Sequence, residues 1–329
     1  MEKQKLILHN RLAPGDVVML TAAVRDIHAT YPDRFLTDVR TPFPELWENN
    51  PHITPLEDDD LEAKHIKCHY PLIHQSNQSG CHFVYGFIEY LNEQLDLKIK
   101  PTAVKGDIHL TDAERDRAGA LERFGLVDQP YWIIVAGGKY DFTIKWWSHE
   151  RFQEVVDEMA DEIHFAQIGR TKHEYHPPLR GVTDLRNKTS LRDLIVLTHH
   201  ADGVLCPVTL AMHLAAAVPV PEGAFPSRPC VAIAGGREPL HWEAYPNHQY
   251  VHTIGALKCC ATGGCWKSRT VPLGDGHKFD SEGGLCVDVT PGGLARCMHL
   301  ITPQVIARAI RLYPSHPALT AISTRALAH

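Results

Sequence analysis

Apolar runs that alternate with helical patterns recur along the second half of this 329-residue chain. The runs are residues 131–136, 164–168, 203–206 and 230–234, and all but the third are followed directly by glycine. Near-continuous apolar runs are typical of strands that are buried on both faces of a parallel sheet. Their alternation with helices predicts a doubly wound α/β sheet, whose ligands bind beyond the carboxyl ends of the strands.

The first half of the chain opens with the same order of strand, turn and helix. Residues 5–9 predict a short buried strand, and the apolar spacing of residues 17–31 predicts a helix that Pro32 ends. Residues 83–95 predict a further helix, and residues 106–110 predict a short strand. We therefore expect a first α/β unit ahead of the longer series.

A short connector is predicted between the two series, because Thr111 and Glu114 have the spacing of a capping box at a helix start. We expect an N-terminal Rossmann-like domain over residues 1–128 and a C-terminal one over residues 129–313, facing each other across a cleft. A single large α/β domain is the alternative. Residues 314–329 form a tail in which we read no function.

Composition narrows the classes of partner and location. The net charge is −6 and no long basic run is present, which argues against nucleic acid as a partner. No segment reaches the roughly 18–20 apolar residues of a membrane span, and the opening apolar stretch is too short for a signal peptide. Nine cysteines without an export signal predict a reducing cytoplasm.

Asp16 is the first candidate for chemistry, since it lies in the turn after the first predicted strand. A carboxylate at that edge of a sheet can accept a proton from a hydroxyl group, as a general base. The alternative is an ordinary aspartate at a helix N-terminus, where it stabilises the helix dipole.

A glycine-rich loop with two lysines is the second candidate. Gly137, Gly138, Lys139 and Lys145 follow a predicted strand, and they combine close backbone approach with positive charge. That combination suits a diphosphate group. The loop matches neither the phosphate loop of nucleoside triphosphatases nor the dinucleotide-binding glycine pattern.

The third candidate is a helix of small residues that begins near Thr209. Its free N–H groups and the Thr209 hydroxyl can hold a phosphate at the same edge of the sheet. His213 lies one turn further along, and its alternative role is that of a packed histidine whose hydrogen bonds are satisfied within the protein.

Five cysteines lie close together in sequence near the C-terminal end, within a segment of residues 258–300: Cys259, Cys260, Cys265, Cys286 and Cys297. Four convergent thiolates suit a tetrahedral zinc or iron ion, and free or disulfide-bonded thiols are the alternative. Adjacent residues rarely both bind one ion, because their side chains diverge on an extended backbone. We therefore predict that Cys265, Cys286 and Cys297 bind the ion, with Cys260 as the fourth ligand and Cys259 as the alternative to Cys260.

Taken in this order, the segments resemble glycosyltransferase family 9, the bacterial heptosyltransferases of GT-B fold. The match begins with Gly15-Asp16 and the helix after it, continues with Lys145-Trp-Trp147, and ends with Thr209 and His213-Leu-Ala-Ala-Ala217. The resemblance implies that Asp16 is the catalytic base and that Lys145 contacts the donor diphosphate.

The resemblance further implies that the helix carrying Thr209, Leu210 and His213 binds the nucleotide sugar, together with Gly15. The family pattern has an acidic residue and a glycine where this chain has Val208 and Leu210, so the donor contacts differ there.

The cysteine segment resembles that of a subset of the family, the autotransporter heptosyltransferases, which glycosylate bacterial adhesins. This resemblance implies a structural ferric ion bound by four cysteines, with zinc as the alternative, and a large homo-oligomer. It also implies inverting transfer of heptose from ADP-heptose to Ser or Thr hydroxyls of an adhesin.

Other functions stay open at this stage. The acceptor can instead be lipopolysaccharide or another glycan. A protein without transferase activity is the remaining alternative, either a metal-stapled nucleotide-binding module or an iron electron carrier.

Overall fold

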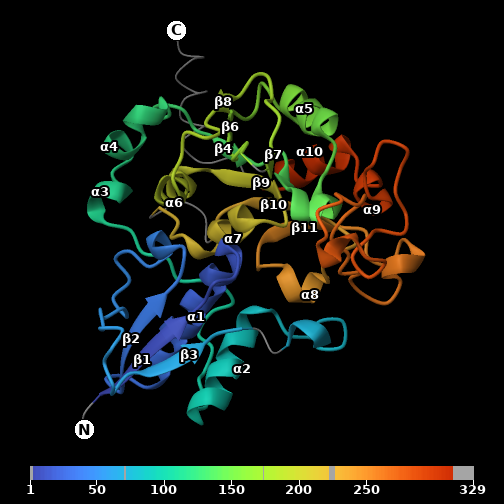
Figure 1. Cartoon of the computed structure of the whole chain (residues 1–329). Helices are drawn as coiled ribbons and strands as arrows, with labels where there is room; N and C mark the ends of the chain where they lie inside the picture. Colours follow the sequence, from blue (N-terminus) through green and yellow to red (C-terminus); the bar gives the residue numbers. More distant parts are fainter. Residues whose placement is uncertain (1–2, 70–71, 173, 222–226, 314–329) are drawn as a thin grey trace.

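Two separate parallel sheets organise the molecule (Figure 1). The computed structural model describes residues 3–69, 72–172, 174–221 and 227–313. The smaller sheet has the order β2-β1-β3. Its strands are β1 (Gln4–His9), β2 (Phe35–Arg40) and β3 (Lys64–Lys67).

The larger sheet has six strands in the order β11-β10-β9-β4-β6-β8, and every neighbouring pair is parallel. They are β4 (Trp132–Ile134), β6 (Phe165–Gln167), β8 (Thr183–Asp184), β9 (Gly203–Pro207), β10 (Cys230–Gly235) and β11 (His248–His252). A two-stranded antiparallel ribbon, β5 (Gly138–Lys139) with β7 (Glu174–Tyr175), lies beside this sheet.

Helices cover both faces of the larger sheet, as a doubly wound fold requires. Ile133 of β4 shares a core with Ile195 and Leu214, from α6 (Leu191–His200) and α7 (Leu210–Ala217). The next residue, Ile134, faces the opposite core, with α5 (His149–Glu158) and α10 (Pro303–Arg311). Successive strand residues point to opposite faces, so the unbroken apolar run at 131–136 is explained.

One helix joins the two halves. α1 (Pro14–Thr30) is buried along most of its length and packs on both α2 (Val84–Leu95) and α7. Its residues belong to a continuous core that extends from β1 to β4 and β9. The start of α1 is therefore fixed relative to the carboxyl edge of the larger sheet.

Shorter elements connect these parts. The short helices are α3 (Asp112–Arg115), α4 (Arg117–Leu121), α8 (Leu240–Glu243) and α9 (Arg296–His299). The 3-10 helices are η1 (Pro44–Leu46), η2 (Ile73–Gln75), η3 (Glu122–Phe124), η4 (Tyr140–Lys145), η5 (Lys258–Cys260) and η6 (Lys278–Asp280). The segment between η5 and α9 has little regular structure apart from η6.

Most elements expected from the sequence are confirmed, including α1, α2 and the capping box of Thr111 with Glu114 at α3. The predicted strand at 106–110 is wrong. Ile108 and Leu110 are buried as a strand pattern implies, but no strand pairs with them. The Asp107 N–H donates to the Thr21 hydroxyl instead, so the segment is tied to α1 rather than to a sheet.

The sequence did not predict β2, β3, β8, β11 and α10. Residues 314–329, the predicted tail, lie outside the described residues. Among the described residues, no helix combines the length and the apolar character that crossing a membrane requires.

Candidate active site

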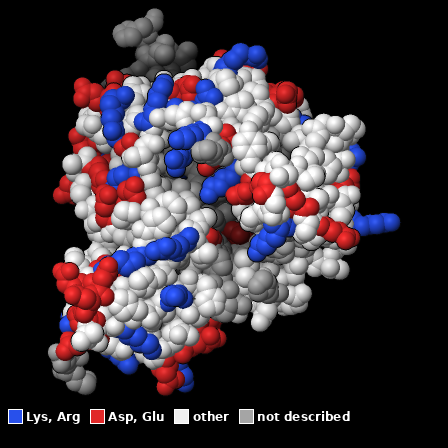
Figure 2. Space-filling model, in the orientation of Figure 1, with Lys and Arg blue, Asp and Glu red and all other residues white. Residues whose placement is uncertain are grey.

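A cavity of about 970 Å³ lies between the two halves, at the carboxyl ends of β4, β6, β9 and β10. Figure 2 shows a hollow in this face of the molecule, with Lys and Arg side chains around its rim and acidic atoms inside it. Its position is the one that the glycines at the strand ends predict for a doubly wound sheet.

Every residue that the sequence analysis assigned to base catalysis or donor binding lines this cavity. They are Gly15, Asp16, Gly137, Gly138, Lys139, Lys145, Thr209, Leu210 and His213. The first two come from the N-terminal half and the others from the C-terminal half, so the cavity brings together segments that are distant in sequence.

Asp16 lies in the first turn of α1 and is half-buried. Its Oδ2 accepts a hydrogen bond from the Ala13 N–H at 3.0 Å, so it also caps the helix. Burial raises the pKa of Asp16 to about 6, against the opposing effects of that hydrogen bond and of Lys145 and Lys139. The carboxylate is thus a stronger base than usual and still largely ionised at pH 7.

Lys145 ends η4 and extends into the cavity. Its Nζ lies 2.6 Å from Glu238 Oε1 and donates to the Val208 carbonyl oxygen at 3.2 Å. The Glu238 side chain is almost fully buried, with 1% of its surface exposed. The ammonium is therefore fixed between β9 and the segment after β10.

Arg237 connects this ion pair to the cysteine segment. The Arg237 guanidinium bonds Glu238 Oε1, and its Nε donates to the Lys267 carbonyl oxygen at 2.7 Å. The same guanidinium lies over the rings of Phe142 and Trp266, at 5.0 and 5.1 Å from their centroids. Phe142 belongs to η4 and Trp266 follows Cys265, so Arg237 joins the lysine loop to the cysteine segment.

The sequence analysis missed Arg237, Glu238 and Glu243. The sequence could have indicated them, because they follow Gly235-Gly236 at the end of a predicted strand. Ligands bind at that edge of a doubly wound sheet. Burial, with the nearby charge of Glu238, raises the pKa of Glu243 to about 8. The cavity therefore contains carboxyl groups in two different protonation states at pH 7.

Thr209 is the N-cap of α7, but its side chain makes no capping hydrogen bond. Its Oγ1 is buried and has no hydrogen-bond partner among the described residues. The hydroxyl and the first N–H groups of α7 face the same cavity, which is the arrangement that binds a phosphate group at a helix N-terminus.

His213 is packed rather than free. Its Nδ1 lies 2.7 Å from the Tyr245 hydroxyl, and its ring is in contact with Gly15. Burial lowers the pKa of His213 to about 3, so the ring is neutral at pH 7. His213 is packed as the alternative role expects, but it also lines the cavity, so its part in donor binding stays a prediction.

The five cysteines near the C-terminal end are all free thiols, and so are the other four. Within the described ranges, no group of three or more His, Cys, Asp or Glu side chains is gathered as a metal ion requires. Cys259, Cys265 and Cys297 each lie within electrostatic reach of Cys286. The metal site stays a prediction.

Cys260, the predicted fourth ligand, is more buried than its neighbour Cys259. It is buried, and its Sγ lies 3.5 and 3.6 Å from the carbonyl oxygens of Thr253 and Leu257, to which it donates. Cys259 is the neighbour whose thiol lies near Cys286 and Cys265. The choice between Cys260 and Cys259 as the fourth ligand stays a prediction.

Gly263 and Gly264, between Cys260 and Cys265, lie in close contact with other parts of the chain. A side chain at Gly263 or Gly264 would collide with Asn77 or Pro239 respectively. Asn77 bonds Gly264 through both its donor and its acceptor, at 2.9 and 2.8 Å. These contacts attach the cysteine segment to the N-terminal half.

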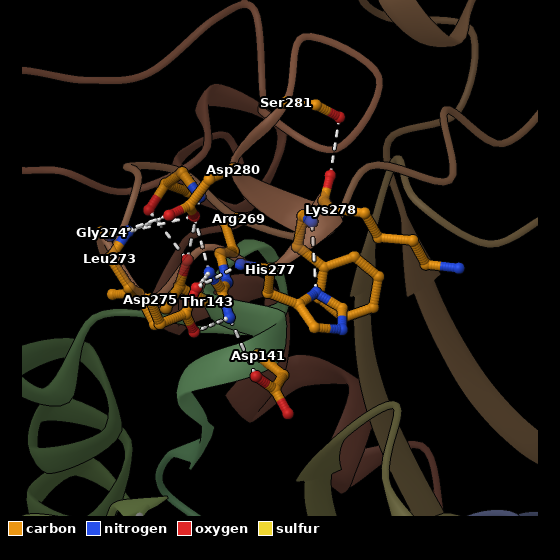
Figure 3. Close-up of polar contacts among 12 residues, drawn as sticks. Asp141, Thr143, Arg269, Leu273, Gly274, Asp275, His277, Lys278, Asp280 and Ser281 are labelled. Atoms are coloured by element: carbon orange, nitrogen blue, oxygen red, sulfur yellow. Dashed lines mark hydrogen bonds and ion pairs between the residues drawn. The ribbon is translucent and has the colours of Figure 1, made fainter.

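A buried arginine also fixes the cysteine segment to the lysine loop (Figure 3). The Arg269 side chain has no exposed surface and binds three carboxylates, those of Asp141, Asp275 and Asp280. Asp141 belongs to η4, which also carries Lys145. The Thr270 N–H donates to Thr143 Oγ1 at 2.9 Å in the same region. The position of Lys145 thus depends on residues 268–280.

Comparison with known proteins identifies the class to which this protein belongs. The sequence pattern of glycosyltransferase family 9 (heptosyltransferase) matches residues 73–262, more than half of the chain. The chain belongs to this family and is a glycosyltransferase. A search of curated protein sequences finds no significant match.

Solved structures share the fold at low sequence identity. A family 9 glycosyltransferase from Veillonella parvula has a TM-score of 0.57 at 14% identity, over 80% of this chain and 92% of that one. ADP-heptose LPS heptosyltransferase II of E. coli has a TM-score of 0.57 at 14% identity, over 94% and 98%. The iron-containing dodecameric glycosyltransferase TibC of enterotoxigenic E. coli has 0.56 at 16%, over 94% and 76%. These likenesses identify the GT-B fold.

We predict that Arg269→Leu loosens η4 without unfolding the protein. The substitution leaves three carboxylates without their shared cation, so amide hydrogen exchange in residues 140–145 should speed up roughly tenfold, as for the loss of one charged hydrogen bond. Hydrogen-exchange mass spectrometry measures this. Arg311→Leu, which removes an exposed arginine bound to Glu158 and Glu162, is the control and should leave exchange in 140–145 unchanged. Equal exchange in both variants would contradict the anchoring role.

Proposed function

We propose that this glycosyltransferase transfers heptose from ADP-heptose with inversion at the anomeric carbon. The observation that carries the proposal is the position of Asp16 and Lys145 on one cavity between the two halves. Asp16 supplies a base whose pKa is about 6, and Lys145 supplies a cation at the end of η4. A solved structure of TibC holds ADP-D-beta-D-heptose, which supports this donor for a chain of the same fold.

The proposed reaction is a single displacement. Asp16 accepts the proton of an acceptor hydroxyl while the hydroxyl oxygen forms a bond to the anomeric carbon. The bond from that carbon to the diphosphate oxygen breaks, and its electron pair leaves with ADP. Lys145, the Thr209 hydroxyl and the N–H groups at the start of α7 stabilise the departing diphosphate. Gly137, Gly138 and Lys139 line the same cavity, and we place the diphosphate next to them.

The acceptor we propose is a Ser or Thr hydroxyl of a bacterial surface protein, an autotransporter adhesin. The cysteine segment supports it, because its five thiols are the feature that resembles the adhesin-modifying subset. Lipopolysaccharide is the second candidate acceptor, since the chain matches almost the full length of a heptosyltransferase that acts there.

We further propose a structural iron ion held by Cys259, Cys265, Cys286 and Cys297, with zinc as the alternative. Cys259, Cys265 and Cys297 each lie within electrostatic reach of Cys286, and the Cys260 thiol donates to the carbonyl oxygens of Thr253 and Leu257. A filled thiolate set leaves no open position for substrate, so the ion would stabilise the segment that holds Trp266 and Arg269. An oligomer is part of the same proposal, because TibC is a dodecamer.

We predict that the purified protein transfers heptose and that Asp16→Asn stops the transfer. Loss of a general base lowers kcat by roughly 10²- to 10⁴-fold, while ADP binding should change little. The assay incubates the protein with ADP-heptose and either a Ser/Thr-rich adhesin fragment or a lipopolysaccharide core, and detects the added mass on the acceptor. ADP-, GDP- and UDP-hexoses serve as donor controls. A fully active Asp16→Asn enzyme would overturn the mechanism.

The pH dependence of the same assay tests the role of Asp16 separately. The raised pKa means that the carboxyl group is protonated below about pH 6 and cannot accept a proton there. We expect kcat/KM to rise through pH 6 and then to level off. A profile that stays flat down to pH 5 would exclude Asp16 as the base.

We predict that Cys259→Ser lowers the metal content of the purified protein and that Cys260→Ser does not. Loss of a ligand should weaken metal affinity by at least about tenfold, whereas the Cys260 thiol donates to the carbonyl oxygens of Thr253 and Leu257. Elemental analysis by mass spectrometry gives both the content and the identity of the metal. The reverse order of the two variants would restore Cys260 as the ligand.

A further inference from the structure

We propose that Glu238 and Glu243 bind hydroxyl groups of the transferred sugar and so determine which sugar the enzyme accepts. This inference rests on the proposed function, because it requires a nucleotide sugar in the cavity. Both residues follow β10, both line the cavity, and neither belonged to the donor site expected from the sequence.

Both side chains present a carboxyl oxygen without a partner. Glu238 and Glu243 are 1% and 8% exposed, and the Oε2 atom of each has no hydrogen-bond partner among the described residues. A buried polar atom without a partner costs roughly 1–3 kcal/mol. Hydroxyl groups of a bound sugar would remove that cost at both positions.

Glu238 supplies an acceptor. Burial favours its neutral form, but Arg237 and Lys145 outweigh that effect and lower the pKa of Glu238. Both cations bind Oε1, so Oε2 is the atom left for a ligand. The carboxylate lies beside the ammonium that we assign to the diphosphate, which is where the sugar is attached.

Glu243 supplies a donor as well as an acceptor. Burial is the main reason that its pKa rises to about 8, and the charge of Glu238 raises it further. The group is therefore mostly a neutral acid at pH 7, with one O–H donor and acceptor oxygens. A charged and a neutral carboxyl together match neighbouring sugar hydroxyls, each of which both donates and accepts.

The position of Glu238 also bears on the departure from the family pattern at Val208. Val208 provides no carboxylate to the cavity, but its carbonyl oxygen binds Lys145, whose Nζ is also bound by Glu238. An acidic group therefore lies next to this point of the cavity, supplied by the segment after β10 rather than by β9.

The experiment compares the affinities for ADP-heptose and ADP by isothermal titration calorimetry, because only the former carries the sugar. We expect Glu243→Leu to weaken ADP-heptose binding roughly ten- to a hundredfold, as for one or two lost hydrogen bonds, and to leave ADP within about threefold. Glu243→Gln keeps a donor and an acceptor and should recover most of the difference. Glu158→Gln, an exposed substitution on α5, is the control.

The outcomes separate this inference from the proposed function. If Glu243→Leu weakens ADP and ADP-heptose equally, or weakens neither, the sugar contact is refuted even though the enzyme binds its donor. If the wild-type protein prefers another nucleotide sugar, the same ratio is measured with that sugar and its nucleotide. If it binds no nucleotide sugar, the proposed function and this inference both fail.

Discussion

The contact between Gly15 and His213 decides where the Asp16 carboxylate lies in the cavity. A side chain at position 15 would be 2.7 Å from His213 Cδ2, so only glycine lets the start of α1 meet α7 this closely. Burial keeps the His213 ring neutral, and the Tyr245 hydroxyl satisfies its Nδ1. Because Asp16 follows Gly15, this contact brings the carboxylate of one half into the same cavity as the start of α7 in the other half.

Lys145 depends on a second set of contacts that converge from three directions. Glu238 binds its ammonium, Arg237 binds Glu238, and Trp266 of the cysteine segment lies against Arg237. Arg269 fixes the other end of η4 through Asp141. The cysteine segment therefore has a role in the site without contributing a reacting group, since it supports the loop that carries the cation.

The sequence was sufficient for features that depend on local pattern. The apolar runs predicted four strands of the larger sheet, β4, β6, β9 and β10, and the cavity lies at their carboxyl ends. Asp16 and Lys145 were predicted as site residues because they lie in the loops that follow predicted strands, and both line the cavity. The strand expected at 106–110 was wrong, because alternating burial also occurs where an extended segment packs on a helix; Asp107 bonds Thr21 of α1.

Long-range partners could not be read from the sequence in the same way. Nothing in the order of residues indicates that Glu238, among the acidic residues of the chain, reaches Lys145. The sequence likewise did not indicate that the Cys260 thiol meets the carbonyl oxygens of Thr253 and Leu257. Such pairings follow from tertiary packing, which the spacing of residues does not encode.

The proposed donor site is one cavity that is lined by residues from both halves. Hydrogen-exchange mass spectrometry with and without ADP-heptose tests this directly. We expect slower exchange in residues 13–17 of the N-terminal half and in residues 137–145, 208–213 and 237–243 of the C-terminal half. Protection elsewhere, with these four segments unchanged, would contradict the assignment of the cavity as the donor site.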